Sequence, residues 1–232
     1  MNLFYCPDIT GTKYILPEEE SKHCIRVLRL KPGDEIHITD GRGNMHLCRI
    51  TRDHPKQCEA EVVSTVNKAS RNANRLHIAI APTKNLERLE WFLEKATEIG
   101  IDEVTPLLCE HAERTVIKPV RLEKVAAAAM KQSLKSWLPV IHPATVFESV
   151  ISKEIPGQKF IAYCETGEEH LLKTHIRPDL DTIILIGPEG DFSPAEVESA
   201  IRCGFTPVSL GPNRLRTETA GVVACVLANN GD

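Results

Sequence analysis

The spacing of hydrophobic and polar positions changes near residue 75 and divides the chain into two parts. Before that point, apolar and polar residues alternate over Glu35–Thr39 and Met45–Ile50, and a similar run covers Glu59–Val66. A period of two predicts strands. Two glycines in Asp40–Asn44 predict a tight turn between the first two runs. The pattern therefore predicts a small β-rich domain over residues 1–70.

One helix is predicted in this first domain, over Glu18–Leu30, and it ends at Pro32–Asp34. Its basic side chains recur at spacings of three and four, which places them on one helix face. Such a face is commonly just solvated, but it also suits contacts to nucleic-acid phosphates. The basic positions are Lys22, His23, Arg26 and Arg29.

The second part alternates short apolar runs with helical periods, which predicts an α/β domain on a mostly parallel sheet over residues 75–232. A polar linker is expected over Lys68–Asn74. The predicted strands are Leu76–Ala81, Val104–Leu108, Lys159–Cys164, Thr182–Ile186 and Thr206–Leu210. The predicted helices are Asn85–Ile99, Val120–Lys135, Pro194–Cys203 and Glu218–Asn229.

Composition narrows the class of protein. No apolar run approaches the roughly 20 residues that cross a bilayer, so neither a membrane span nor a leader is expected. The eight cysteines are scattered without a CxxC pair, which favours reduced thiols and a cytoplasmic protein. A net charge of −4 argues against non-specific coating of nucleic acid.

The strongest local signal follows the apolar run that ends at Ile186. A Gly-Pro-Glu-Gly bend over Gly187–Gly190 leads to Ser193 and Glu196, which form a capping box with a proline at the first helical position. Ligands of parallel α/β sheets bind at such strand ends. A ligand-binding loop and a merely well-made turn are about equally supported by these residues alone.

A second bend follows Leu210, where Gly211-Pro212 leads to Arg216 and Glu218 at the start of a helix. The rest of that helix is small or apolar, so it belongs to a core or to a subunit interface. A helix-start salt bridge is the simpler interpretation of the charged pair. Two similar bends in one domain nevertheless favour a shared ligand site.

Several common signatures are absent from the sequence. Neither the dinucleotide-binding nor the P-loop glycine pattern occurs, and the metalloprotease and esterase motifs are missing as well. Cys109-Glu110-His111 could supply two metal ligands, but no second pair accompanies it. We therefore expect no metal.

Read together, these motifs resemble a known family. Ile186–Gly190, with Leu210-Gly211 and Leu215–Ala220, is similar to the paired signature of the RsmE-type 16S ribosomal RNA uridine-N3 methyltransferases, in the SPOUT superfamily. The likeness covers nearly the whole chain. Further matching segments are His23–Asp34, Lys95–Ile101, Glu113–Thr115 and Gln132-Ser133.

The resemblance implies a PUA-like N-terminal β-barrel and a C-terminal α/β domain with a trefoil knot. It also implies a cytoplasmic homodimer that binds S-adenosyl-L-methionine and methylates N3 of one uridine in small-subunit ribosomal RNA. The residues implied to bind the cofactor are Ile186, Gly187, Pro188, Glu189, Gly190, Leu210, Gly211, Leu215, Arg216, Thr217 and Ala220. Lys22, His23, Arg26 and Arg29 are the expected RNA-binding residues.

For the chemistry, Arg216 is the first candidate to stabilise the uracil anion, and Arg114 is the second. Glu218 could orient Arg216 or accept the N3 proton. Three positions depart from the family pattern: Asp191 replaces a second glycine, Lys131 a glutamate and Lys135 an arginine. Ribose 2′-O methylation, a non-catalytic RNA-binding assembly factor and a small-molecule enzyme are the competing hypotheses.

Overall fold

The computed structural model describes residues 2–67, 74–164, 166–167 and 170–229, which divide into two compact units. Unit 1 joins the first part of the chain to the distant segment 130–138, and unit 2 contains the remainder. Most of the expected linker, residues 68–73, lies outside the described residues.

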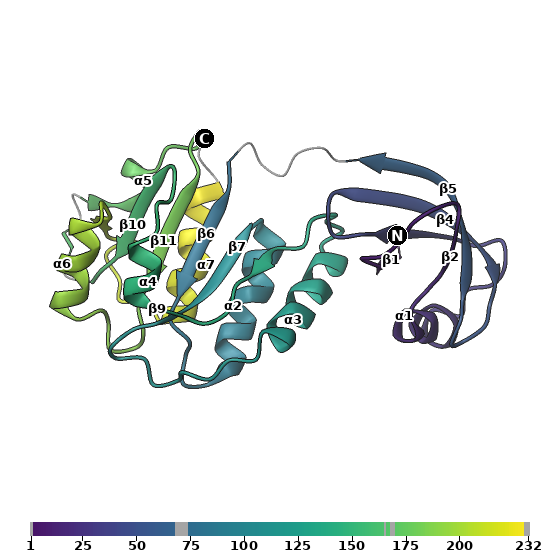
Figure 1. The fold of residues 1–232 in the computed structure, drawn as a ribbon, viewed down its shortest axis with the longest axis horizontal. Coiled ribbons are helices and arrows are strands. Elements are labelled where there is room, and N and C mark those ends of the chain that lie inside the picture. Colours follow the sequence, from purple (N-terminus) through teal and green to yellow (C-terminus); the bar gives the residue numbers. More distant parts are fainter. Residues whose placement is uncertain (1, 68–73, 165, 168–169, 230–232) are drawn as a thin grey trace. The chain divides into compact units, whose positions relative to one another are not determined.

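Unit 1 is built around a five-stranded sheet in the order β1-β3-β4-β5-β2 (Figure 1). The pair β1 and β3 is parallel, and the other neighbours are antiparallel. Alternate side chains of β3, Ile36 and Ile38, are fully buried, as the period of two predicts. The elements are β1 (Leu3–Tyr5), β2 (Lys13–Ile15), α1 (Glu18–Lys22), η1 (His23–Val27), β3 (Glu35–Thr39), β4 (Asn44–Arg52) and β5 (Glu59–Asn67).

The prediction of one α-helix over Glu18–Leu30 is wrong. The α-helix ends at Lys22 and continues as the wider π-helix η1, in which the Leu28 N–H bonds the His23 carbonyl at 3.0 Å. The wider turn leaves Cys24 fully buried in the unit 1 core. A spacing pattern that fits an α-helix does not reveal such a change of pitch.

Segment 130–138 completes unit 1 through hydrogen bonds. The carbonyl of Ser136 accepts from the Gly43 N–H at 2.8 Å and from the Thr39 hydroxyl at 3.2 Å. The Leu138 N–H donates to the Gly41 carbonyl at 2.9 Å. These contacts fix the glycine turn between β3 and β4.

Unit 2 contains one parallel sheet in the order β12-β10-β11-β6-β7-β8, and β9 also pairs with β7. The predicted α/β class on a mostly parallel sheet is confirmed. The strands are β6 (Leu76–Ile80), β7 (Glu103–Leu108), β8 (Val140–Ile141), β9 (Thr145–Val146), β10 (Gln158–Ala162), β11 (Thr182–Ile186) and β12 (Thr206–Val208). The helices are α2 (Leu86–Ile99), α3 (Pro119–Gln132), α4 (Phe147–Ile151), α5 (Leu172–His175), α6 (Pro194–Arg202) and α7 (Thr217–Asn229).

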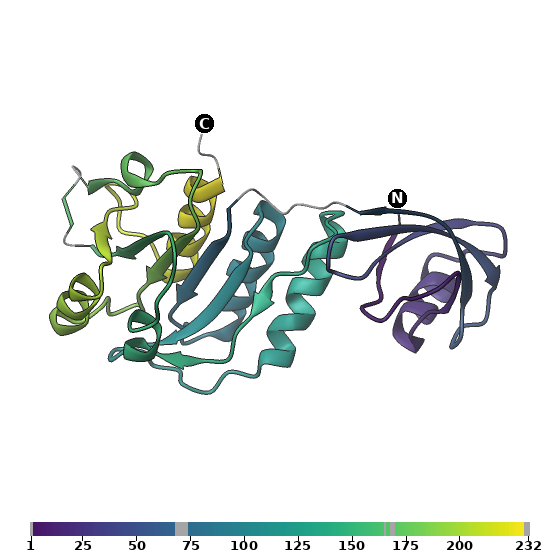
Figure 2. The same ribbon diagram turned by 45° about the horizontal axis from the view of Figure 1, so that its top comes forward.

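Both faces of the unit 2 sheet are covered where β6 and β11 run through its centre (Figure 2). On one face, Ala79 and Leu185 join a core with Phe147 of α4 and Val197 of α6. On the other, α2 and α7 pack together, and Gly221 brings α7 close to β6. A Cβ at that glycine would lie 2.6 Å from the Phe92 ring and 2.9 Å from Ile80.

In the part of the chain that the structure describes, no helix combines the length and the apolar character needed to cross a bilayer.

Candidate functional site

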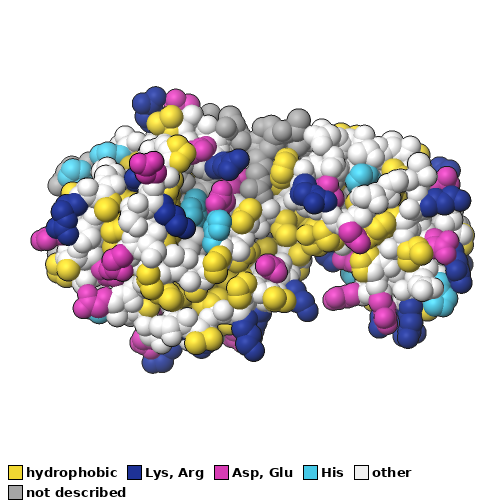
Figure 3. Space-filling model, viewed as in Figure 1, with side chains coloured by type: hydrophobic (Ala, Val, Ile, Leu, Met, Phe, Trp, Pro, Cys, Tyr) yellow, Lys and Arg dark blue, Asp and Glu magenta, His cyan; other side chains and the backbone are white. Residues whose placement is uncertain are grey.

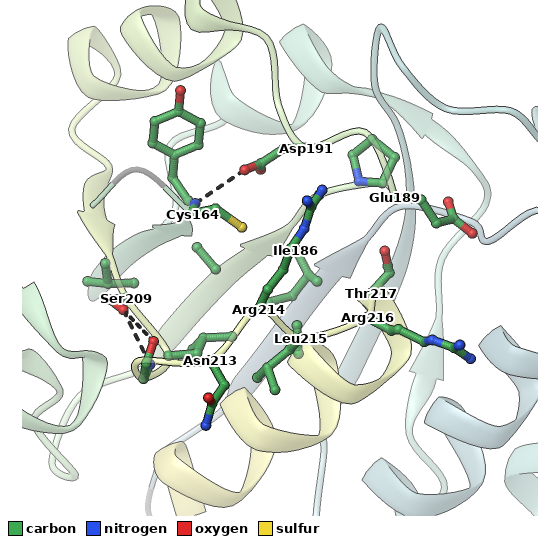
Figure 4. A pocket seen from close by; sticks show the side chains of 18 of the residues that line it. Cys164, Ile186, Glu189, Asp191, Ser209, Asn213, Arg214, Leu215, Arg216 and Thr217 are labelled. Carbon is green, nitrogen blue, oxygen red and sulfur yellow. Dashed lines mark hydrogen bonds between the residues drawn. The ribbon is translucent and has the colours of Figure 1, made fainter. Parts of the chain in front are cut away.

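Two bends that are distant in sequence line one cavity of about 740 Å³ at the carboxyl edge of the unit 2 sheet. The first bend, residues 187–193, follows β11, and the second bend, residues 209–216, follows β12. Strand β10 lies between β12 and β11, so all three parallel strands end at the same edge. Figure 4 shows side chains from both bends around this hollow.

The first bend is shaped by Asp191, at the position where the resemblance implies a second glycine. Its φ is +63°, in the left-handed region that aspartate tolerates better than most residues. The Oδ1 atom accepts from the Phe192 N–H at 2.8 Å, and Oδ2 accepts from the Cys164 N–H at 3.2 Å. The carboxylate thus ties the bend to the segment that follows β10, which glycine could not do.

Neighbouring loops hold the first bend from the other side. The His111 Nδ1 atom lies 3.0 Å from the Asp191 carbonyl oxygen, and a Cβ at Gly190 would lie 3.3 Å from the His111 Cβ. The Lys84 N–H donates to the Glu189 carboxylate at 3.2 Å. Gly190 itself therefore packs against His111 and is not among the residues that line the cavity.

The exit of the first bend is fixed by the predicted capping box. The Ser193 hydroxyl accepts from the Glu196 N–H at 3.3 Å, and the Glu196 carboxylate accepts from the Ser193 N–H at 2.9 Å. The same carboxylate accepts from the Glu110 N–H at 2.9 Å. One buried glutamate thus caps α6 and anchors the loop after β7.

The second bend is more open. Ser209 Oγ exchanges hydrogen bonds with the backbone of Gly211, whose φ of +138° lies in the region that favours glycine. Pro212, Asn213 and Arg214 are exposed. In Figure 4, Arg214 reaches into the cavity, whereas Arg216 points away from it.

Sequence reasoning missed part of the cavity wall. Ala162, Tyr163 and Cys164, which end β10 and follow it, form a third lining segment. The signal was available, because β10 was a predicted strand and parallel strands end at one edge. The other lining residues not foreseen are Asp191, Val208, Ser209, Pro212, Asn213 and Arg214.

Ten of the eleven residues implied to bind a cofactor line this cavity. The exception is Gly190, as described above. The ten are Ile186, Gly187, Pro188, Glu189, Leu210, Gly211, Leu215, Arg216, Thr217 and Ala220.

The candidate catalytic residues lie in different environments. The exposed Arg216 guanidinium has no hydrogen-bond or ion-pair partner among the described residues. Glu218 is buried and faces Arg88 of α2, with 3.9 Å between Oε1 and Nε. Glu218 thus pairs across two helices, and the helix-start salt bridge with Arg216, which was the simpler alternative, is not formed among the described residues.

Arg114 lies outside the cavity lining but is connected to it. Its guanidinium donates to the Lys84 carbonyl at 3.0 and 3.3 Å, and the N–H of the same lysine bonds Glu189. This places Arg114 behind the first bend as a support for its glutamate.

The basic positions of unit 1 separate into two groups. Lys22, His23 and Arg26 line one surface hollow together with Glu18 and Glu19. Lys22 also pairs with Glu18 at 2.6 Å.

Arg29 lies beyond the helix, with a φ of +56°, and is not part of that hollow. In Figure 3, dark-blue and magenta side chains alternate over the visible face of unit 1. The hollow that holds Lys22, His23 and Arg26 is mixed in charge, because Glu18 and Glu19 line it as well.

Two of the three departures from the family pattern have a visible role. Asp191 fastens the first bend, as described above. Lys131 pairs with Glu20 at 2.6 Å inside unit 1, so its charge is matched there. Lys135 follows α3, and its N–H donates to the Met130 carbonyl at 3.0 Å.

Burial raises the pKa of the Cys109 thiol, which disfavours the thiolate that binds metals. Among the described residues, no group of three or more histidine, cysteine, aspartate or glutamate side chains is placed to hold a metal ion.

Comparison with known proteins defines the class. The model of an RNA methyltransferase domain matches residues 69–229, and the model of an RNA methyltransferase PUA domain matches residues 16–63. The chain therefore belongs to the RNA methyltransferase family.

Individual relatives agree with this membership. Ribosomal RNA small subunit methyltransferase E of Buchnera aphidicola is 29% identical over 218 residues, which cover 91% of this chain and 85% of that protein. The enzyme of the same name from Aquifex aeolicus is 27% identical, and the match covers 99% of this chain and all of that protein. The resemblance to the RsmE-type family is thus confirmed.

Solved structures show the same fold over the whole chain. A probable rRNA-methyltransferase from Porphyromonas gingivalis has a TM-score of 0.90 and 46% identity, and the match covers 97% of this chain and 95% of that one. A Legionella pneumophila protein, described as a methyltransferase in complex with the bound cofactor SAM, has a TM-score of 0.87 and 26% identity. That match covers 97% of this chain and 96% of the other.

Proposed function

We propose that this protein is an S-adenosyl-L-methionine-dependent methyltransferase that methylates N3 of a uridine in small-subunit ribosomal RNA. The observation that carries the proposal is the single cavity lined by both bends. Relatives named as small-subunit rRNA methyltransferases match nearly the full chain, and a SAM-bound protein shares its fold.

The chemistry of the cavity suits this cofactor. Its volume of about 740 Å³ lies within the range of small-molecule sites. Ile186, Leu210 and Leu215 offer apolar surface to an adenine ring, and backbone groups of the bends offer hydrogen bonds. Glu189 and Arg214 supply charges opposite to the ammonium and carboxylate of a methionine moiety.

In the proposed reaction, the cofactor supplies a methyl group already activated on a sulfonium, so the protein's main task is positioning. The remaining requirement is loss of the uracil N3 proton, which leaves negative charge on the imide. Arg216, which has no described partner, would stabilise that charge. Glu218 would accept the proton, and Arg114 would act at a distance by supporting Glu189.

We further propose that the α/β unit carries the trefoil knot of the related family and that the protein is a cytoplasmic homodimer. The dimer proposal is supported by α7, on which Val222, Val223, Val226 and Leu227 stay only half-buried within one chain. A second copy would cover this apolar surface.

Unit 1 is proposed to bind the RNA backbone through Lys22, His23, Arg26 and Arg29. Each phosphate contact that is lost should lower the salt dependence of RNA binding by about 0.7–0.9 in log–log slope. The Arg26→Ala/Arg29→Ala double variant should show this change. An unchanged slope would contradict the assignment.

The reaction is tested with purified protein, radiolabelled S-adenosyl-L-methionine and small ribosomal subunits that lack the modification. Nuclease digestion and mass spectrometry then locate the methyl group on base or ribose. A ribose 2′-O product would favour the competing methylation, and failure to bind the cofactor in calorimetry would favour a non-catalytic factor. Arg216→Ala should lower kcat strongly, and full turnover in this variant would contradict the role assigned to Arg216.

A further inference from the structure

A second hollow of about 390 Å³ adjoins the cofactor cavity in unit 2, and Arg216 lines both. Its other walls come from the first two turns of α2 and the first turn of α7. A residue shared by two cavities is placed where a group held in one could meet a group held in the other. The remaining lining residues are Asn85, Glu87, Arg88, Trp91, Glu218 and Thr219.

The charged groups of this hollow keep hydrogen-bonding capacity. The Arg88 Nε and Glu218 Oε1 atoms are 3.9 Å apart, which allows attraction but exceeds hydrogen-bond length. Glu218 is only 7% exposed, and its Oε2 atom is buried without a hydrogen-bond partner. A buried carboxylate with an unfilled acceptor is costly, so it favours a bound donor.

An aromatic side chain forms the outer wall. Trp91 lies on α2 one turn after Arg88 and is 44% exposed, which is unusual for the largest apolar side chain of a packed helix. Asn85 and Glu87, in contrast, hydrogen-bond each other as part of the α2 cap. The groups left for a ligand are thus one indole, two guanidiniums and one carboxylate.

This set matches the edge and face of uracil. The Watson–Crick edge of uracil presents acceptor, donor and acceptor at O4, N3–H and O2. Two guanidiniums can donate to the carbonyl oxygens and one carboxylate can accept from N3–H, while an exposed indole offers a stacking surface for the ring. Cytosine presents an amino donor and a ring-nitrogen acceptor at the corresponding positions, so it would meet a guanidinium and the carboxylate unfavourably.

We propose that this hollow is the target-base subsite, in which Trp91 stacks on the uracil ring and Arg88, Arg216 and Glu218 read its edge. The proposal rests on the function proposed above and adds to it the residues that select the base. Arg88 and Trp91 have no counterpart in the sequence-based predictions.

Binding is tested with uridine and cytidine 5′-monophosphates as probes. Trp91 and Trp137 are the two tryptophans of the chain, so a Trp137→Phe variant reports Trp91 fluorescence alone. In the presence of S-adenosyl-L-homocysteine, the uridine nucleotide should quench this signal with saturation. Its affinity should exceed that of the cytidine nucleotide by about tenfold or more. Equal quenching by both, or no saturable quenching, overturns the subsite.

Kinetics separate this proposal from the proposed function. Trp91→Ala should lower kcat/KM for small ribosomal subunits by about tenfold or more, and Trp91→Phe should restore most of it, since a phenyl ring also stacks. Cofactor affinity should stay unchanged in both variants. Glu94→Ala, at a partly exposed position of the same helix where the side chain pairs with Lys95, serves as the matched control.

The outcomes are distinguishable. If the unaltered protein transfers no methyl group, the proposed function fails. If it transfers normally while Trp91→Ala keeps full kcat/KM, only the subsite fails. The subsite also fails if Trp91→Ala changes the oligomeric state in light scattering, because the indole then faces a second copy of the chain.

Discussion

The two bends that line the cavity are built in opposite ways. The first bend is held from three neighbouring loops: through Cys164 after β10, Lys84 after β6 and His111 after β7. The second bend is anchored at its first residue, where the Ser209 N–H donates to the His170 carbonyl and the Ser209 carbonyl accepts from the Leu172 N–H, both at 2.9 Å. Ser209 also bonds Gly211, and Pro212, Asn213 and Arg214 beyond it are exposed. The first bend is therefore held along its length, whereas the second bend is held at its start and exposed at its tip.

The largest effect on the first bend is expected from a change at Asp191. Asp191→Ala removes two hydrogen-bond acceptors and leaves a side chain that disfavours a φ of +63°. The free energy of unfolding should fall by about 2–3 kcal/mol, measured by urea denaturation. Asp191→Gly should lose less, because glycine accepts this φ without strain. Equal losses in the two variants would show that the backbone conformation is not part of the cost.

A change at Gly211 tests the open bend. A Cβ there would meet no atom within 4 Å, so the cost of Gly211→Ala comes from its φ of +138° alone. Unfolding free energy should fall by about 1–2 kcal/mol. The exposed tip of the bend can relieve this strain by changing its conformation, which would displace residues that line the cavity. The cofactor affinity measured by calorimetry should therefore fall as well. Unchanged affinity would indicate that this wall does not adapt to the ligand.

The N-terminal cap of α6 is one of the contacts that hold the first bend. Ser193→Ala removes one member of the capping box and should cost about 1 kcal/mol in thermal unfolding. Cofactor affinity should change less than twofold, since the other anchors of the first bend remain. Ser199→Ala, later in the same helix, is a control with no cap to lose. A large loss of affinity would mean that the cap, rather than Asp191, holds the bend.

The smallest effect is expected at His77, which lies outside both bends, near the amino-terminal end of β6. Burial lowers the pKa of His77 to about 4, so between pH 6.5 and pH 4 the unfolded chain binds a proton that the folded chain does not. Stability must therefore decrease as pH falls, by under about 1 kcal/mol from pH 7 to pH 6. His77→Asn should remove this slope in denaturation curves. Cofactor affinity should be equal in both proteins at each pH.

Local patterns were sufficient for the alternation of strands and helices, since buried parallel strands read as continuous apolar runs. They also placed both bends at strand ends and predicted the capping box at Ser193. Local patterns could not predict contacts between segments that are distant in the sequence. Three such contacts depend on elements that meet only in the folded chain. They are the pairing of Glu218 with Arg88, the position of the exposed Trp91 beside Arg216, and the hydrogen bonds that Asp191 makes to the segment after β10.

The hydrogen bonds of segment 130–138 have a practical consequence for dissecting the protein. A fragment that stops near residue 70 would carry Thr39, Gly41 and Gly43 without segment 130–138, which forms their hydrogen bonds. It would also expose the side of the glycine turn that Leu138 covers, where a Cβ at Gly41 would lie 3.2 Å from the Leu138 Cβ. Unit 1 is thus formed by two segments that are distant in the sequence. Neither segment can be exchanged between homologues independently of the other.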